Sequence, residues 1–262
     1  MSLTEDAEAF REEVYQPKPP TLLLTAMEVQ RALLELSTLP AALPLLRKAP
    51  KGDGHPVLVL PGFTASDIST TPLRRYLSRL GYEVFAWELG RNWGMTGDLE
   101  ERMHARTAEI HADSGRKITI VGWSLGGIYA REIARRRPHA VRQVITMGSP
   151  FATAGNGSYA VHVYDSLTGE RVTKRRATLA KGIAQAPPVP CTSIFTKTDG
   201  VAAWESCLEV ESPTTDNIEV FGSHCGLGFN PIVLYAIADR LAQAEGEWRP
   251  FDRSGRRRHF FN

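Results

Sequence analysis

The sequence around Ser124 has a spacing that supports nucleophilic chemistry. Residues 122–126 are Gly-Trp-Ser-Leu-Gly, which matches the pattern Gly-x-Ser-x-Gly. The β-branched run before it, residues 118–121, predicts a buried strand, and residues 128–137 after it predict a helix. A serine at a tight turn between a strand and a helix has its hydroxyl held clear of the backbone, and flanking glycines let the two elements approach closely. We therefore predict that Ser124 is a nucleophile, the alternative being an ordinary glycine-rich turn.

A serine hydroxyl is a weak nucleophile and needs a base that a carboxylate orients. Where a nucleophile elbow serves such a triad, the acid and then the histidine follow the serine along the chain, each after a strand. Asp199 follows a strand predicted at residues 191–196, and His224 follows one predicted at 217–221. We therefore predict Asp199 as the acid and His224 as the base. Two other aspartates are less suitable as the acid, because Asp165 lies in the predicted insertion and Asp216 precedes the last strand. The other histidines do not follow the last strand: His55, His104, His111, His139 and His162 come before Asp199, and His259 lies in the tail.

The oxyanion that such a serine creates needs two backbone N–H donors. One is expected from Leu125, the residue after the nucleophile, at the positive end of the following helix. The other is expected from Phe63, in the loop after the first predicted strand, where Gly62 lets the chain turn; Thr64 is the rival donor, and plain packing is the other role for Phe63. The side chain of Trp123 is expected to pack. The side chains predicted to contact a substrate are Thr64, Trp93 and Phe151.

The elements that position these residues alternate between strand and helix. Strands are predicted at residues 56–60, 82–87, 118–121, 141–147, 191–196 and 217–221, and helices at 69–80, 98–111, 128–137 and 231–242. This alternation predicts an α/β fold with a mostly parallel six-stranded sheet and helices on both faces. In such sheets ligands lie at the carboxyl ends of the strands, where the predicted catalytic residues fall.

The segment before the predicted sheet, residues 1–50, is expected to be a helical extension of a domain at residues 51–246. A short polar helix or a frayed end is predicted over residues 1–15, and an apolar helix is predicted between Pro20 and Pro40. We expect the extension to pack on the domain; covering the active-site mouth, pairing with a second copy in a homodimer and lying on lipid are the alternatives. The prolines expected to interrupt the chain after that helix are Pro44 and Pro50.

Two further segments depart from the alternation. Residues 151–188 are rich in Gly, Thr, Ser and Ala and predict a lid-like insertion at the strand-end face, a plain surface excursion being the alternative. Residues 247–262 form a basic C-terminal tail, which is expected to be solvated; contact with an anionic surface is the alternative.

Composition limits the class of protein. The chain has 262 residues, of which 42% are hydrophobic and 23% charged, and its net charge of +2 is too small to argue for nucleic-acid binding. The cysteines, Cys191, Cys207 and Cys225, lack metal-ligand spacing, and a pairing of Cys207 with Cys225 stays open. The acidic N-terminus lacks the apolar core of a signal peptide, and no run reaches the ~18 apolar residues of a membrane span. We therefore expect a cytoplasmic location with reduced thiols.

These motifs together resemble the α/β-hydrolase superfamily, and within it small bacterial serine lipases and esterases. The resemblance covers residues 56–242 and rests on residues 121–127, on Asp-Gly at 199–200 and on Gly-Ser-His at 222–224. It implies a compact six-stranded hydrolase fold, a Ser-His-Asp triad, an acyl-enzyme intermediate and no metal or organic cofactor. The loop at residues 61–63 has Pro-Gly-Phe where many members have His-Gly, and the elbow has Trp-Ser-Leu in place of His-Ser-Met or His-Ser-Gln, so the resemblance does not assign a substrate.

The resemblance implies a carboxylic-ester hydrolase of the esterase or lipase type, acting on a small-molecule or lipid acyl ester. An acyltransferase or thioesterase would use the same triad and is the first alternative. A non-catalytic binding protein on the same fold is the second, although the retention of serine, aspartate and histidine argues against it.

Overall fold

The strands of the described chain form one parallel sheet. The structure is a computed structural model that describes residues 17–152 and 184–261, so the helix predicted at 1–15 and most of the insertion at 151–188 lie outside the described residues. The strand order is β2-β1-β3-β4-β5-β6 and every neighbouring pair is parallel. This confirms the predicted fold class. The strands are β1 Pro56–Leu60, β2 Glu83–Ala86, β3 Ile118–Trp123, β4 Val141–Met147, β5 Cys191–Phe195 and β6 Thr215–Glu219.

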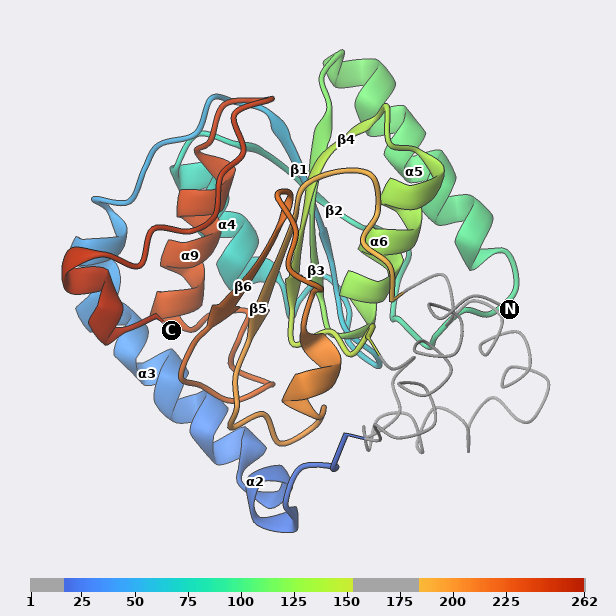
Figure 1. The fold of residues 1–262 in the computed structure, drawn as a ribbon. Helices are drawn as coiled ribbons and strands as arrows, with labels where there is room; N and C mark the ends of the chain where they lie inside the picture. The colour runs from blue at the N-terminus through green and yellow to red at the C-terminus, as the bar shows by residue number, and fades with distance from the viewer. Residues whose placement is uncertain (1–16, 153–183, 262) are drawn as a thin grey trace, which may run out of the picture.

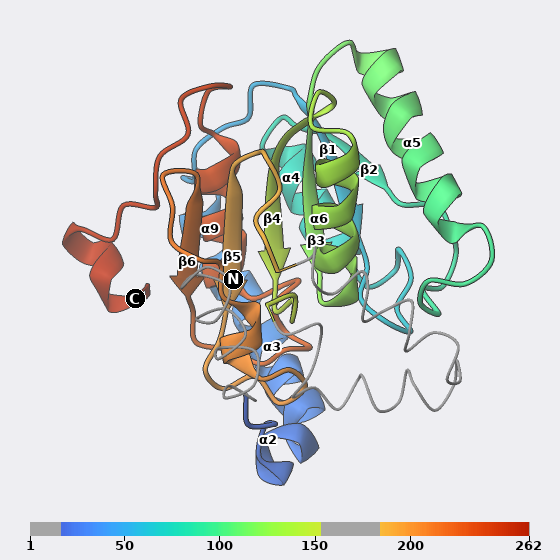
Figure 2. The same ribbon diagram turned by 45° about the vertical axis from the view of Figure 1, so that its right-hand side comes forward.

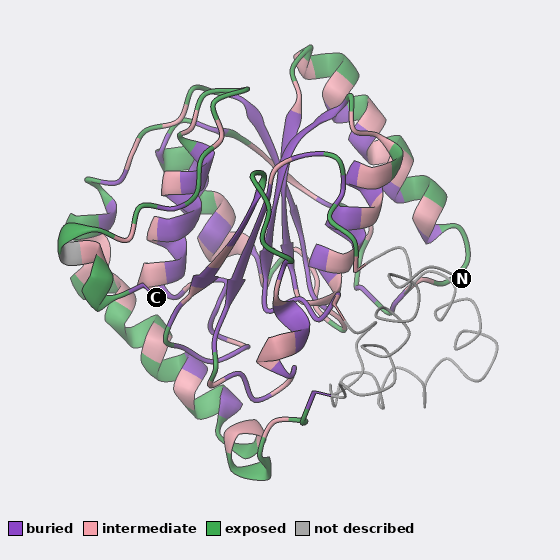
Figure 3. Ribbon diagram, in the orientation of Figure 1, coloured by how far each residue is buried: buried purple, intermediate pink, exposed green. Residues whose placement is uncertain are grey.

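Helices cover both faces of the sheet, as Figures 1 and 2 show. On one face, α4 (Thr71–Arg79) and α9 (Pro231–Leu241) bury one apolar cluster; on the other, α5 (Leu99–Ser114) and α6 (Leu125–Arg136) bury a second. The inner strands β1, β3, β4 and β5 are buried along their whole length, because the helices cover both of their faces, whereas the outer strands β2 and β6 are partly exposed (Figure 3). Polar side chains of a site can therefore gather in the loops at the carboxyl ends of the strands.

The N-terminal extension is helical, but its prolines do not end it. After the short helix α2 (Leu22–Ala26), α3 runs from Glu28 to Leu46 and continues through Pro40 and Pro44. The prediction that these prolines interrupt the chain was wrong. The C-terminal half of α3 packs its apolar side on the core beside α9, and this burial offsets the hydrogen bonds that each proline removes.

The last residues of the chain also differ from expectation, because they pack on the domain. Phe251 and Phe261 are buried in the core, and Arg253 donates to the carboxylate of Asp216, which also accepts the N–H of Phe251 at 2.7 Å. Asp216 lies inside β6, which begins at Thr215, whereas the sequence analysis placed it before the last strand. Buried aromatic side chains thus turn a basic tail into a packed segment that ends in a 3-10 helix, Gly255–His259.

Across residues 17–152 and 184–261, the structure contains no helix with the length and apolar character needed to span a membrane.

Candidate active site

The turn at Ser124 has the strained geometry of a nucleophile elbow. Ser124 joins β3 to α6 with φ 53° and ψ −121°, a conformation that residues other than glycine rarely adopt. Its N–H donates to the carbonyl of Met147 at the end of β4. Because α6 begins at Leu125, the N–H of Leu125 belongs to the first turn and has no acceptor within the helix. A partly positive helix end therefore lies directly after the serine.

Glycines around the turn leave no room for side chains. A Cβ atom at Gly122 would overlap the backbone of Gly126, and one at Gly126 would lie 2.5 Å from the carbonyl oxygen of Leu60. A Cβ atom at Gly127 would overlap the side chain of Ser149. The close approach of strand and helix expected from the sequence is therefore present.

Asp199 and His224 meet at the carboxyl ends of β5 and β6. The Nδ1 atom of His224 lies 2.6 Å from Oδ2 of Asp199, and both side chains are buried. The other carboxylate oxygen of Asp199 accepts the N–H groups of Val201 and Ala202 at 2.8 and 2.7 Å. These bonds fix the carboxylate so that one oxygen faces the imidazole.

Burial and charge act in opposite directions on the imidazole. Burial lowers the pKa of His224, whereas the charge of Asp199, its hydrogen bond and the charge of Glu28 raise it, and the net pKa lies above the ordinary value. A negative environment of this kind favours the imidazolium that forms when histidine accepts a proton from serine.

The elbow and the acid–base pair are joined through the end of β4 and through Trp123. A Cβ atom on Gly148 would lie 3.0 Å from Nδ1 of His224 and 3.2 Å from Oδ2 of Asp199, so the residue after Met147 touches the pair. The indole N–H of Trp123 donates to the carbonyl of His224 at 3.1 Å, which gives this side chain the packing role expected for it. Trp123 and Gly148 thus place the turn at Ser124 and the end of β4 next to the Asp199–His224 pair.

The loop after β1 lies against the serine. A Cβ atom at Gly62 would lie 3.2 Å from Cβ of Ser124. The N–H of Thr64, the rival oxyanion donor, donates to the carbonyl of Asn92 at 2.7 Å and is thereby occupied. The assignment of Phe63 and Leu125 as oxyanion donors stays a prediction from the sequence.

Asn92 is a structural contributor that the sequence analysis missed. Its side-chain amide donates to the carbonyl of Pro61 at 2.9 Å, and its backbone N–H donates to Ala65 at 2.8 Å, so the loop after β2 holds the loop beside the serine. Asn92 is completely buried. Its place in an irregular loop gave no periodic signal from which this role could be predicted.

The residues predicted to contact substrate differ in exposure. Thr64 is exposed and Trp93 is 53% exposed, with the guanidinium of Arg91 over its ring. Phe151 is completely buried, and the guanidinium of Arg131 stacks 3.7 Å from its ring centroid. Arg131 in turn pairs with buried Glu209. This placement favours packing for Phe151 over contact with substrate.

Helix α3 brings charged side chains to the acid and histidine loops. Glu28, Arg31 and Glu35 contact residues on both sides of Asp199 and His224. From the sequence, this segment was predicted only as an apolar helix, and its charged residues were given no role. Their spacing of three and four residues, which puts them on one helix face, was the signal that could have identified them.

The cysteines are free thiols in the structure, so the open pairing of Cys207 with Cys225 is not made. Burial and the charge of Glu28 raise the pKa of Cys225 to about 12, which keeps this thiol neutral beside the histidine. Within the described residues, no group of three or more His, Cys, Asp or Glu side chains is placed to hold a metal ion.

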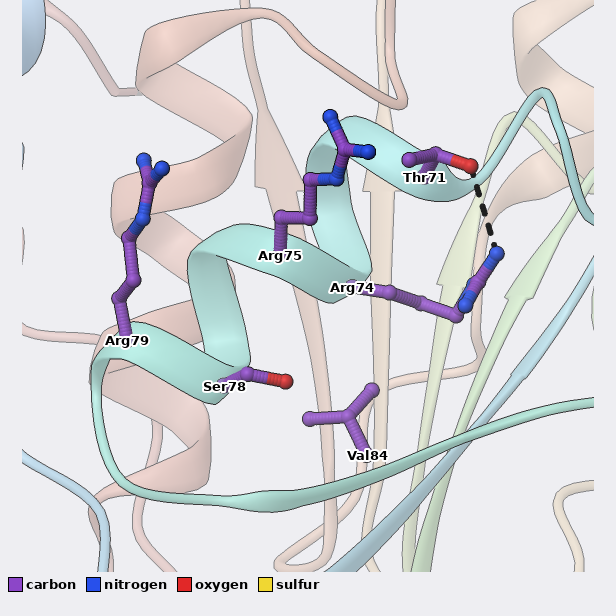
Figure 4. Close-up of a pocket in the computed structure, with 6 residues that line it drawn as sticks. All are labelled: Thr71, Arg74, Arg75, Ser78, Arg79 and Val84. Carbon is purple, nitrogen blue, oxygen red and sulfur yellow. Dashed lines mark hydrogen bonds between the residues drawn. The ribbon is translucent and has the colours of Figure 1, made fainter.

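A surface hollow of about 590 Å³ opens beside α4 and β2, away from the serine. Arg74, one of the lining residues, donates to the hydroxyl of Thr71 (Figure 4). It also donates to the carbonyl of Asp67. None of its lining residues belongs to the predicted site: Thr71, Arg74, Arg75, Ser78, Arg79 and Val84.

Comparison with solved structures identifies the fold. Mouse alpha/beta hydrolase domain-containing protein 10 is similar with a TM-score of 0.50 and 18% identity, over 74% of this chain and 92% of that one. Aspergillus fumigatus lipase B gives 0.52 and 17%, over 76% and 55%, and a Bacillus licheniformis lipase in its mature form gives 0.52 and 14%, over 74% and 94%. The chain has the α/β-hydrolase fold, as the resemblance implied.

Sequence comparison adds one curated relative. The pimeloyl-(acyl-carrier protein) methyl ester esterase of Shewanella sp. (strain MR-7) is 34% identical over 116 residues. This match spans 43% of the chain and 42% of the relative's own length. No family model matches the chain.

Proposed function

We propose that this chain is a serine hydrolase that cleaves carboxylic esters through Ser124, His224 and Asp199. The observation that carries the proposal is the buried 2.6 Å contact between His224 and Asp199, located beside a serine on a strained strand-to-helix turn. The esterase and lipase names of the similar proteins agree with this reaction type.

In the proposed reaction, Oγ of Ser124 attacks the acyl carbonyl while Nε2 of His224 takes its proton. Asp199 accepts the Nδ1–H bond and stabilises the imidazolium, and the N–H groups of Leu125 and Phe63 donate to the oxyanion. The alcohol leaves with the proton from His224, and the acyl group stays on Ser124. Water, activated by the same imidazole, then attacks this acyl-enzyme and releases the acid.

The substrate we propose is a small-molecule or lipid acyl ester. A series of p-nitrophenyl esters of increasing acyl length measures the preference for the acyl group. An alcohol added to the same assay separates hydrolysis from acyl transfer, because a transferase would form a new ester instead of free acid.

A fluorophosphonate probe, which reacts with activated serines, tests the proposal directly. We expect the probe to label the wild-type protein and Ser124→Ala to lose both labelling and ester hydrolysis. The control is Ser37→Ala, an exposed serine on α3, which should keep both. Undiminished hydrolysis by Ser124→Ala would show that the nucleophile is another residue, and a wild-type protein inert to probe and esters would contradict the catalytic assignment.

A further inference from the structure

The inner face of α3 carries a carboxylate that contacts both loops of the acid–base pair. Glu28 is 3% exposed, although it belongs to an N-terminal extension. Its Oε1 atom accepts the N–H of Gly200 at 2.7 Å and that of His224 at 3.1 Å, and its Oε2 atom accepts the N–H of Cys225 at 2.9 Å. Glu28 therefore binds the residue after Asp199 and the backbone of His224 with one carboxylate.

Arg31 and Glu35 extend this contact along the same helix face. The guanidinium of Arg31 donates to the carbonyls of Thr198 and Gly222 at 2.8 and 2.6 Å, one on each loop. The carboxylate of Glu35 accepts the N–H of Ser223 at 2.7 Å. Helix α3 thus bonds residues that precede Asp199 and His224 as well as residues that follow them.

The two loops have glycines where α2 and α3 approach them. A Cβ atom at Gly200 would lie 2.5 Å from the carbonyl of Leu24 and 2.7 Å from Oε1 of Glu28. One at Gly226 would overlap the carboxylate of Glu35, and one at Gly222 would lie 3.0 Å from it. None of these three glycines has a positive φ, so close approach explains them better than backbone conformation does.

A buried carboxylate beside another carboxylate is unfavourable unless it is well bonded. Glu28 lies close enough to His224 for its charge to act on the imidazole, which already faces Asp199. Its neutralising contacts are backbone N–H groups of the site itself and, at 3.7 Å, Arg31. Apolar packing alone would attach α3 to the domain, as it does near α9, without placing a charge there.

We propose that Glu28 is a positioning residue that sets the geometry of the Asp199–His224 pair, with Arg31 and Glu35 supporting it. Through these residues α3 is part of the catalytic apparatus and not only an addition to the fold. This inference rests on the proposed function of Asp199 and His224. It extends that function, because the site is completed by α3, a helix that belongs to the N-terminal extension.

Two substitutions distinguish the effect of the side-chain length of Glu28 from the effect of its charge. Glu28→Gln keeps the length of the side chain but removes the charge and directs an N–H₂ group at a backbone N–H. Glu28→Asp keeps the charge but is one methylene too short to bond both loops. We expect both to lower kcat on the order of 10- to 100-fold with a much smaller change in KM, because a displaced imidazole affects the reacting geometry.

The pH profile distinguishes the two variants. The charges that act on His224 are those of Asp199, at the end of β5, and of Glu28, on α3. Arg31 and Glu35 bond Gly222 and Ser223 just before the histidine, and the thiol of Cys225, which burial keeps neutral, follows it. Loss of the Glu28 charge should move the acid limb of kcat/KM to lower pH in Glu28→Gln, whereas Glu28→Asp should retain the wild-type limb. The control is Glu101→Gln, a change at an exposed residue of α5, which should alter neither kcat nor the acid limb of kcat/KM.

A readout that does not need activity keeps this test separate from the proposed function. In the wild-type protein the Nδ1 proton of His224, bonded to Asp199, should give a downfield proton NMR signal that His224→Ala lacks. Glu28→Gln should shift or broaden that signal even if no ester is ever hydrolysed. A signal absent from the wild type would contradict the Asp199–His224 pair itself.

The inference is overturned if Glu28→Gln keeps its kcat, its acid limb and its NMR signal. It is also overturned if activity falls only in step with the folded fraction while the limb and the signal stay unchanged, because that result describes a structural role. Should Glu28→Gln fail to fold, Glu35→Gln serves instead: its carboxylate bonds Ser223 next to the histidine, and a smaller loss of kcat with the same change in the NMR signal is expected.

Discussion

The predicted nucleophile and the predicted acid–base pair of this protein are held in different ways. Ser124 takes its geometry from residues close to it in the chain, chiefly the glycines of the elbow and the start of α6. Asp199 and His224 lie in loops that α3 bonds across sequence separations of 167 to 197 residues.

The site therefore depends on two different ways of positioning its side chains. A strained turn is enforced by local backbone geometry, so almost any substitution at its glycines should damage it. A pair of loops is positioned by hydrogen bonds from elsewhere, which can be removed one at a time while the sheet stays folded. The predictions that follow test this contrast.

Removal of the acid should have the largest effect. Asp199→Asn keeps the shape of the side chain but cannot hold the imidazolium in the same way, and we expect kcat to fall roughly 10⁴-fold. Thermal unfolding measured alongside should show a folded protein. A loss of tenfold or less would mean that another carboxylate, Glu28 being the nearest candidate, serves as the acid.

Damage to the elbow should be the next largest effect. A Cβ atom in Gly122→Ala would overlap the backbone of Gly126, and we expect destabilisation of about 3 kcal/mol together with loss of probe labelling. Chemical denaturation measures the change. The matched control is Gly246→Ala at a remote turn, where φ is positive but no atom lies within 4 Å of the new Cβ, so labelling should survive.

The pH dependence of activity should show the raised pKa of His224. The base must be neutral to accept the proton of serine, so kcat/KM should fall on the acid side with a midpoint above the ordinary value of 6.5. In the Asp199→Asn protein, which lacks the largest of the charges that raise this pKa, the midpoint should move to lower pH. A wild-type midpoint below 6.5 would contradict the negative environment described here.

The smallest expected effect concerns the helix that follows the histidine loop. Asn230 caps α9 by accepting the N–H of Ile232 at 2.9 Å, and its amide donates to Glu35 at 2.8 Å. Asn230→Ala should lower the free energy of unfolding by about 1 kcal/mol. Asn230→Ser keeps an oxygen that can cap the helix, so it should recover most of that stability, but it still lacks the bond to Glu35. A reduced kcat in both variants would therefore show that the bond to Glu35 affects catalysis independently of the helix cap.

The sequence predicted the parts of the molecule that depend on neighbouring residues. Alternating strands and helices predicted the sheet, and a ten-residue stretch predicted the elbow at Ser124. Asp199 and His224 could be selected because each follows a strand, and the structure brings them together, although their catalytic roles stay predictions. The boundary of β6, two residues earlier than expected, changed the role of Asp216.

The parts that the sequence did not predict depend on contacts between distant segments. Pro40 ends a helix by local rules, but α3 continues because its apolar side is buried. In the sequence, nothing distinguishes Glu28 from a charged residue on the exposed side of a helix. It contacts the site only because the backbone N–H groups of residues 200 and 224 approach its carboxylate. Hydrophobic periodicity contains no information about which backbone N–H groups a carboxylate will meet.

The distance along the chain between α3 and the loops it bonds has a consequence for the order in which the site is made during synthesis. A nascent chain that ends before residue 191 already contains α3, the elbow and Ser124, but neither the acid nor the base. The charged face of α3 then has no loop to bind, and Glu28 stays in water as an ordinary carboxylate. The predicted nucleophile is therefore translated before the predicted acid and base, and the bonds from α3 form only when residues 199–230 reach the helix that was made first.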